Sequence, residues 1–95
     1  MFAINVHLTV KDEADVTTVR DLLAECGRRS REEPGCVRYE VCHSQSNPRL
    51  FMLNERWADE QAWKDHKERA AVTEIYLPKV IPLVDRVPHI STLVE

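Results

Sequence analysis

The chain has little that would suit it to a membrane, a nucleic acid or a secretory pathway. No stretch approaches the roughly 18 apolar residues that a membrane helix needs, and no basic, apolar leader opens the sequence. Its 13 basic and 16 acidic residues leave a formal charge of −3, which gives no electrostatic reason to expect a nucleic-acid partner. We therefore expect a cytoplasmic protein that binds neither membranes nor nucleic acids.

Cysteine is also scarce, and its spacing excludes the common paired motifs. The sequence contains three cysteines, Cys26, Cys36 and Cys42. Their number is odd and no two of them form a Cys-x-x-Cys pair, which is typical of free thiols in a reducing cytoplasm. The four histidines, His7, His43, His66 and His89, form no close ligand pair in the sequence either. The sequence therefore predicts no metal site.

No linker, repeat or low-complexity segment divides the sequence, so residues 1–95 are expected to form a single domain. A domain of this size hides only about 60–65% of the surface that its extended chain would expose. Its core is therefore thin, and small domains of this kind often complete their burial against a second subunit. We expect a homodimer.

Two periodicities divide the sequence into strands and helices. Alternating apolar and polar residues, typical of half-buried strands, occur over about 2–10, 36–44, 49–57 and 87–94. Apolar residues at helical spacing occur over about 16–33, 59–70 and 72–80, and Asp59 is the expected N-cap of the second of these stretches. Pro34 and Gly35 are expected to end the first helix, and Pro78 and Pro82 to kink or end the last.

The order strand, helix, strand, strand, helix, strand predicts an α+β fold of the ferredoxin-like βαββαβ type, with an antiparallel sheet and the helices on one face. On the second strand, Val37, Tyr39 and Val41 are expected to share a face. The uncovered face combines apolar area with polar groups such as Asn5 and His7. Such a face is too apolar to be exposed to solvent and too polar to form a hydrophobic core. We therefore expect the sheet of a second subunit to cover it and to enclose a cavity lined by side chains.

Several motifs together resemble one known family. A Glu33-Pro34-Gly35-Cys36 corner leads into a Tyr-x-Val strand at Tyr39, a Glu-x-Trp strand follows at Glu55, and a histidine stands on a predicted helix at His66. This layout resembles the antibiotic biosynthesis monooxygenase family over nearly the whole chain. The resemblance implies a dimeric α+β barrel that oxidises an electron-rich aromatic, such as a quinol or polycyclic phenol, with dioxygen and no cofactor or metal. Many relatives carry a second histidine where this chain has Ala71.

Three residues are candidates for catalysis. His66 is the best acid or base, because imidazole is the only side chain whose ordinary pKa lies near neutral pH; a helical histidine bonded to a neighbouring carboxylate is the alternative. Glu55 should share a face with Trp57, where desolvation would keep its proton, unless it pairs with Arg38 instead. Asn5 is unusual within a strand, and the resemblance implies that it orients the substrate.

The walls of the cavity are predicted to be aromatic side chains and one further histidine. The residues expected to contact the substrate are His7, Tyr39, Trp57, Trp63 and Tyr76. Trp57 has the simpler alternative of a core anchor where the third strand meets the second helix. In the haem-degrading branch of the family, a tryptophan and an iron-binding histidine stand where this chain has His66 and Tyr76, so haem binding is not expected.

Three other functions fit parts of the pattern. The resemblance also covers cofactor-free isomerases of small keto-sugars, for which Arg38, Arg56 and Lys79 would be the available anchors for a phosphate. A dimer that only binds an aromatic metabolite is the non-enzymatic alternative. An RNA-recognition domain has the same element order, but the third strand lacks the basic, glycine and aromatic signature that stacks bases.

Overall fold

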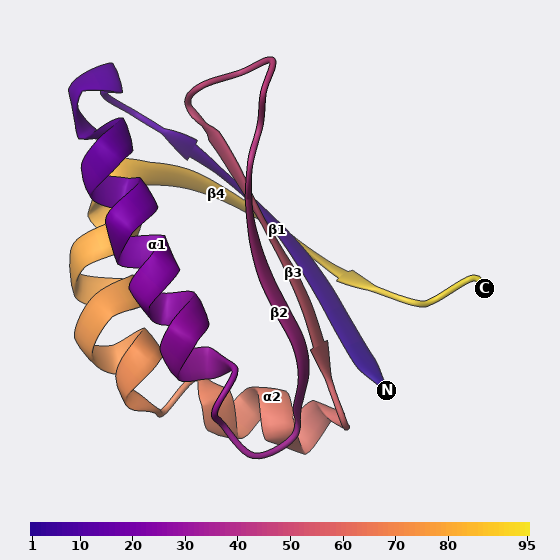
Figure 1. Ribbon diagram of the computed structural model, residues 1–95. Coiled ribbons are helices and arrows are strands. Elements are labelled where there is room, and N and C mark those ends of the chain that lie inside the picture. Colours follow the sequence, from indigo (N-terminus) through magenta and orange to yellow (C-terminus); the bar gives the residue numbers. More distant parts are fainter.

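A computed structural model describes all 95 residues (Figure 1). Four strands form one antiparallel sheet in the order β2-β3-β1-β4. They are β1 (Phe2–Val10), β2 (Cys36–His43), β3 (Leu50–Trp57) and β4 (Val84–Ser91). The predicted α+β fold with its antiparallel sheet is confirmed. The last strand begins earlier than expected because Val84 already pairs with Val10.

The helices all lie on one face of the sheet (Figure 1). They are α1 (Val16–Ser30), α2 (Glu60–His66) and the wider helix η2 (Ala71–Val80), with the short turns η1 (Glu13–Asp15) and η3 (Ile81–Leu83). The expected N-cap of α2 is confirmed, since Asp59 accepts a hydrogen bond of 2.8 Å from the backbone of Ala62. None of these helices combines the length and the hydropathy that a membrane span requires.

The segment after α2 differs from the prediction in two ways. The helix ends at His66 instead of continuing to residue 70, and Ala70 is an exposed residue at the N-cap of η2. Pro78 neither ends nor interrupts η2, which continues to Val80. In an α-helix the proline ring meets the carbonyl four residues earlier. The wider turns of η2 relieve that clash, and this explains why the helix continues.

The core lies between the helices and the inner face of the sheet. Alternate residues of β1, namely Ile4, Val6, Leu8 and Val10, are all buried there, as the sequence predicted. Trp57 and Phe51 contribute the largest fully buried side chains from β3. The alternation of β1 places Asn5 and His7 on the opposite face, which no helix covers (Figure 1).

One strand departs from its predicted alternation. Val37 was expected to share a face with Tyr39, but Val37 is 54% exposed and Tyr39 is buried. The register between β2 and β3 shifts between Cys36 and Arg38, so the chain contains one extra residue at Val37. A bulge of this kind interrupts the alternation of side chains, so residues two positions apart across it lie on opposite faces of the sheet. The irregularity directs Tyr39 to the helix side of the sheet.

Gly35 is required by the corner that precedes β2. Its φ of +82° lies in the left-handed region, and an added Cβ would stand 2.6 Å from the Cβ of Ala62. We expect Gly35→Ala to lower the free energy of unfolding by at least about 2 kcal/mol. Gly27→Ala is the matched control, because Gly27 has no positive φ, a helix favours alanine, and the added Cβ would meet Arg31 Nη1 at 3.0 Å and Val41 Cγ2 at 3.3 Å. Urea denaturation measures both, and equal effects would contradict the prediction.

Candidate active site

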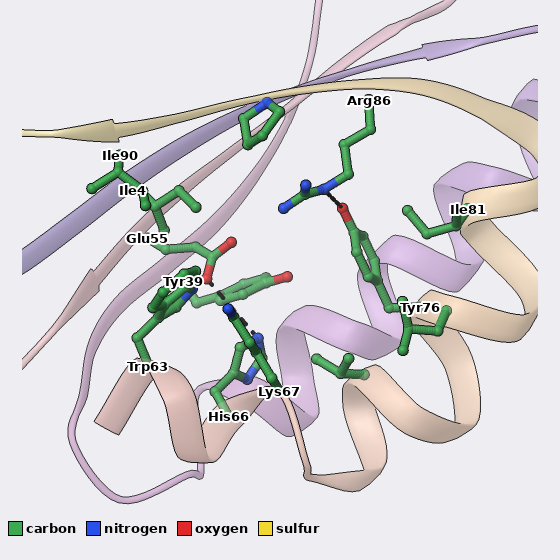
Figure 2. A pocket seen from close by; sticks show the side chains of 13 residues that line it. Ile4, Tyr39, Glu55, Trp63, His66, Lys67, Tyr76, Ile81, Arg86 and Ile90 are labelled. Carbon is green, nitrogen blue, oxygen red and sulfur yellow. Dashed lines mark hydrogen bonds and ion pairs between the residues drawn. The ribbon is translucent and has the colours of Figure 1, made fainter. Parts of the chain in front are cut away.

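A cavity of about 610 Å3 lies between the sheet and the segments α2 and η2 (Figure 2). Its volume is within the range of about 300–1,000 Å3 that small-molecule sites occupy. Most of its walls are apolar or aromatic, and they include Ile4, Trp63, Tyr76, Ile81 and Ile90. Four other lining residues carry acidic or basic side chains: Glu55, His66, Lys67 and Arg86. A single chain builds the whole cavity.

This location differs from the predicted chamber between two sheets. The cavity lies on the helix-covered face, whereas Asn5 and His7 lie on the other face of β1. Asn5 pairs with Asn54 in the sheet register and its amide donates to Ser91 Oγ at 3.4 Å. His7 packs edge to face against His89, with 5.9 Å between ring centroids. The structure therefore does not bring Asn5 and His7 together with His66.

His66 is the last residue of α2 and is buried. Its Nδ1 lies 2.7 Å from Oε1 of Glu33, in the corner that follows α1. Both side chains are less than a tenth exposed. A carboxylate can only accept a hydrogen bond, so Nδ1 of the neutral imidazole carries the proton and donates it to Glu33. The contact with a carboxylate that the sequence allowed as an alternative is present, and it leaves Nε2 as the basic nitrogen.

Glu55 lies on the other side of the same imidazole. Its Oε1 is 4.0 Å from Nε2 of His66 and accepts a hydrogen bond of 3.1 Å from Nε1 of Trp57 (Figure 2). Burial raises the pKa of Glu55 to about 7, although the bond from Trp57 opposes the change. Arg38 is not its partner, because that guanidinium lies 4.0 Å from Glu40. Glu55 can therefore hold a proton near neutral pH.

Burial shifts the pKa values of His66 and Glu55 in opposite directions. Burial lowers the pKa of His66 from its ordinary value, against the opposing effect of the Glu33 hydrogen bond. Burial raises that of Glu55. Near neutral pH, a basic nitrogen and a carboxyl group that can hold a proton thus face one cavity. Such a pair can accept one proton from a ligand and donate another.

Aromatic rings surround this pair. The ring of Tyr39 lies 5.9 Å from that of His66, and burial raises the pKa of Tyr39 well above its ordinary value. Trp57 stands 4.5 Å from the His66 ring, but it is fully buried and does not line the cavity. Its simpler predicted role, a core anchor, agrees with this position. Trp63 does line the cavity and stacks on Phe2, with 4.6 Å between centroids.

Comparisons with known proteins identify the family and the fold of the chain. Residues 1–76 match the model of the family described as Antibiotic biosynthesis monooxygenase. The chain belongs to this monooxygenase family. A search of the curated proteins finds no match. The match covers α2 and reaches Tyr76, so Glu33, Glu55 and His66 all lie within the matched residues.

Solved structures of the antibiotic biosynthesis monooxygenase type have the same fold. One named for that family is 24% identical, with a TM-score of 0.90 and complete coverage of both chains. A second, from Nitrosomonas europaea, is 22% identical with a TM-score of 0.91, also over both whole chains. The cofactor-independent oxygenase SnoaB from Streptomyces nogalater is 13% identical, covers 99% of this chain and 93% of its own, and gives a TM-score of 0.86.

Sequence reasoning missed three residues of this monooxygenase-family chain: Glu33, which contacts His66 from outside the cavity lining, and Lys67 and Arg86, which line the cavity. Glu33 belongs to the motif that carried the resemblance, yet nothing in the sequence indicates that it reaches His66, 33 positions later. Lys67 and Arg86 line the cavity without a local signal for a site. The sequence offered only two indirect indications: Lys67 is adjacent to His66, and Arg86 lies near the alternating pattern of the last strand.

The raised pKa of Glu55 predicts a pH-dependent stability in this family member. Between the ordinary pKa of 4.5 and the folded value of about 7, the folded protein binds more protons than the unfolded one. The contribution of Glu55 to the free energy of unfolding is therefore fully present below the unfolded pKa, and it is lost as the pH rises through about 7. Glu55→Gln cannot titrate. We expect the difference in free energy of unfolding, Glu55→Gln minus the natural protein, to increase by about 3 kcal/mol between about pH 4 and about pH 8.5.

Chemical denaturation at a series of pH values measures this difference. The lowered pKa of His66 gives a change of opposite sign, but it is common to both proteins and largely cancels in the comparison. A difference between the two proteins that stays constant with pH would contradict the assignment of a protonated Glu55.

Proposed function

We propose that this chain is a cofactor-independent monooxygenase that oxidises an electron-rich aromatic, such as a quinol or polycyclic phenol. The observation that carries the proposal is the row of contacts from Glu33 through His66 to Glu55, which ends in an apolar cavity. It places a base and an acid 4.0 Å apart at a largely apolar cavity. The family membership supports the same reaction class.

The reaction begins with the loss of a phenolic proton to Nε2 of His66. The phenolate passes one electron to dioxygen, which gives a phenoxyl radical and superoxide. These recombine to form a carbon–oxygen bond, and protonation gives a hydroperoxide on a ring carbon that carries hydrogen. Loss of water then leaves a carbonyl on that carbon, so one oxygen atom enters the product and the other becomes water. The protein has to orient the phenol, remove its proton and exclude solvent.

The roles follow from the geometry. His66 is the base, and Glu33 holds its ring and stabilises the imidazolium that forms. Glu55, with its raised pKa, donates the proton to the peroxide oxygen. The rings of Tyr39, Trp63 and Tyr76 form walls against which a planar ligand packs. Asn5 and His7 have no part in this version of the site.

The phosphate anchors predicted for the isomerase alternative do not lie at the cavity. Arg38 and Arg56 pair with each other in the register of β2 and β3, Lys79 is an exposed residue of η2, and none of them lines the cavity. The non-catalytic alternative, a protein that only holds an aromatic metabolite, has the same walls. The presence or absence of turnover separates it from the proposal.

An oxygen electrode with a panel of hydroquinones and anthrones tests the proposal. We expect uptake of one dioxygen per product, unaffected by added chelator and by removal of small molecules through gel filtration. Binding of panel members without oxygen uptake above the uncatalysed rate would favour the non-catalytic alternative and reject the monooxygenase.

We also propose that two chains associate through the face of the sheet that no helix covers. Asn5, His7 and Asn54 lie there, with Val87, which is 52% exposed. This mixture suits a partly polar interface between two sheets. Sedimentation equilibrium at micromolar concentration should give the mass of two chains, and the mass of one chain at every concentration would reject the dimer. The cavity itself would remain, since one chain builds it.

A further inference from the structure

Two histidines meet on the face of the sheet that no helix covers. His7 lies on β1 and His89 on the neighbouring strand β4 (Figure 1). Their rings pack edge to face, with 5.9 Å between centroids. His89 is opposite Asn5 in the strand register, so its side chain shares a face with Asn5 and His7. The sequence predicted no metal site because its histidines are far apart along the chain, but the fold brings these two together.

Neither of the two rings is engaged by another polar group of the protein. The histidine ring nitrogens that form hydrogen bonds within the chain are those of His43 and His66. The ion pairs that involve a histidine are those of His66. His7 and His89 are both exposed, so their rings can turn on a fast timescale. The nitrogens of both rings are therefore available to a ligand.

The separation of the two rings fits a pair of imidazoles on one metal ion. A metal–nitrogen bond of about 2.0–2.1 Å places the ion about 3.2 Å from the centre of the ring. Two rings on one ion then have centroids from about 4.5 Å apart at a right angle to about 6.4 Å apart in line. The observed 5.9 Å lies within this range. Rotation of the side chains is therefore enough to direct one nitrogen of each ring at a shared ion.

Asn5 adds an oxygen beside the two rings. It stands two positions before His7 on the same face of β1 and directly opposite His89. Its amide nitrogen donates to Ser91 Oγ at 3.4 Å, and its Oδ1 accepts no hydrogen bond within the protein. No third histidine, cysteine or carboxylate joins the group. Two imidazoles with one amide oxygen suit Ni2+, Cu2+ or Zn2+ better than Mg2+ or Ca2+, and water would complete the coordination.

We propose that His7 and His89, together with Oδ1 of Asn5, form a binding site for a divalent transition-metal ion. The ion joins the edge strand β4 to its only neighbour, β1. The site goes beyond the proposed function, because it lies on the opposite face of the sheet from the cavity and the oxygenation described above uses no metal. If two chains associate through this face, the ion lies at their interface.

Isothermal titration calorimetry of the chain without an affinity tag, with Ni2+ as the probe, tests the site. Ni2+ suits the test because the three free cysteines favour Zn2+ instead. We expect at most one ion per chain, which millimolar Mg2+ does not displace. His7→Gln and His89→Gln should each weaken binding by at least about tenfold, because losing one of two linked ligands removes the gain from chelation. Asn5→Ala should weaken it by about two- to fivefold, since an amide oxygen is the weaker ligand.

The matched control is His43→Gln. His43 is also exposed and on a strand, but its ring contacts the backbone of Pro48 and stacks on Phe51. Its replacement should leave the Kd for Ni2+ within about twofold.

The imidazole signals in a nuclear magnetic resonance spectrum identify the ligands independently. Ni2+ is paramagnetic and broadens the signals of nuclei close to it. The chain has four histidines, so single substitutions can assign every imidazole signal. With less than one Ni2+ per chain, the signals of His7 and His89 should disappear before those of His43 and His66.

Three outcomes would overturn the inference. They are no heat of binding up to about 1 mM Ni2+, an affinity that His7→Gln or His89→Gln leaves unchanged, and broadening that begins at His43 or His66. The measurements need neither turnover nor an aromatic ligand. A protein that binds Ni2+ through His7 and His89 but consumes no oxygen would therefore retain the metal site and reject the proposed monooxygenase, and the reverse result would do the opposite.

Discussion

Replacing His66 by glutamine is expected to lower kcat/KM for the oxygenation of an accepted quinol by at least about 100-fold. Glutamine keeps a polar group of similar reach, but it cannot take a proton at neutral pH. The loss should appear in kcat, because the walls that bind the ring are unchanged. Stopped-flow or oxygen-electrode kinetics give both constants.

The matched control is His43→Gln. His43 lies at the end of β2, where it stacks on Phe51 and contacts the backbone of Pro48, far from the cavity lining. Its replacement should leave kcat/KM within about twofold. A His66→Gln protein that is folded, as judged by its circular dichroism, and retains full turnover would show that another group is the base.

Glu33→Gln is expected to reduce kcat by about 10- to 100-fold and to change the pH dependence of what remains. The hydrogen bond and charge of Glu33 are what oppose the lowering of the His66 pKa by burial. Without them the imidazole stays unprotonated to lower pH, so the acidic limb of the pH–rate profile moves to lower pH. The plateau falls because the imidazolium formed in the reaction loses its stabilising carboxylate.

The shift of the acidic limb of the pH–rate profile separates a positioning role of Glu33 from a purely structural one. A loosened fold would lower the activity without moving the acidic limb. Glu32→Gln is the control, because Glu32 is the exposed neighbour of Glu33 and makes no ion pair within 4.0 Å. A Glu33→Gln protein with an unchanged acidic limb would contradict the role given to this carboxylate.

The elements of the fold were predictable because their apolar patterns are local. Alternation along β3 put Glu55 on the face of Trp57, and the structure agrees, since both are buried and joined by a hydrogen bond. Asp59 capped the helix that the sequence assigned to it. Each of these features depends on residues within two or three positions of one another.

The features that sequence reasoning missed depend on three-dimensional packing. The bulge at Val37 has no marker in the sequence, and it decides which way Tyr39 points. The contact between Glu33 and His66 joins two corners of the chain. The cavity lies on the side of the sheet that α2 and η2 cover, and its position depends on how these segments pack against the inner face.

The location of a bound aromatic is the most direct test of the account, because every proposed role requires the ligand on the helix side of the sheet. Nuclear magnetic resonance of labelled indole and imidazole groups suits this chain, which has two tryptophans and four histidines. On titration with a naphthol that resists oxidation, the account predicts large shifts for Trp63 and His66 and none for His7 and His89. Shifts confined to His7 and His89 would place the site on the uncovered face and contradict the account.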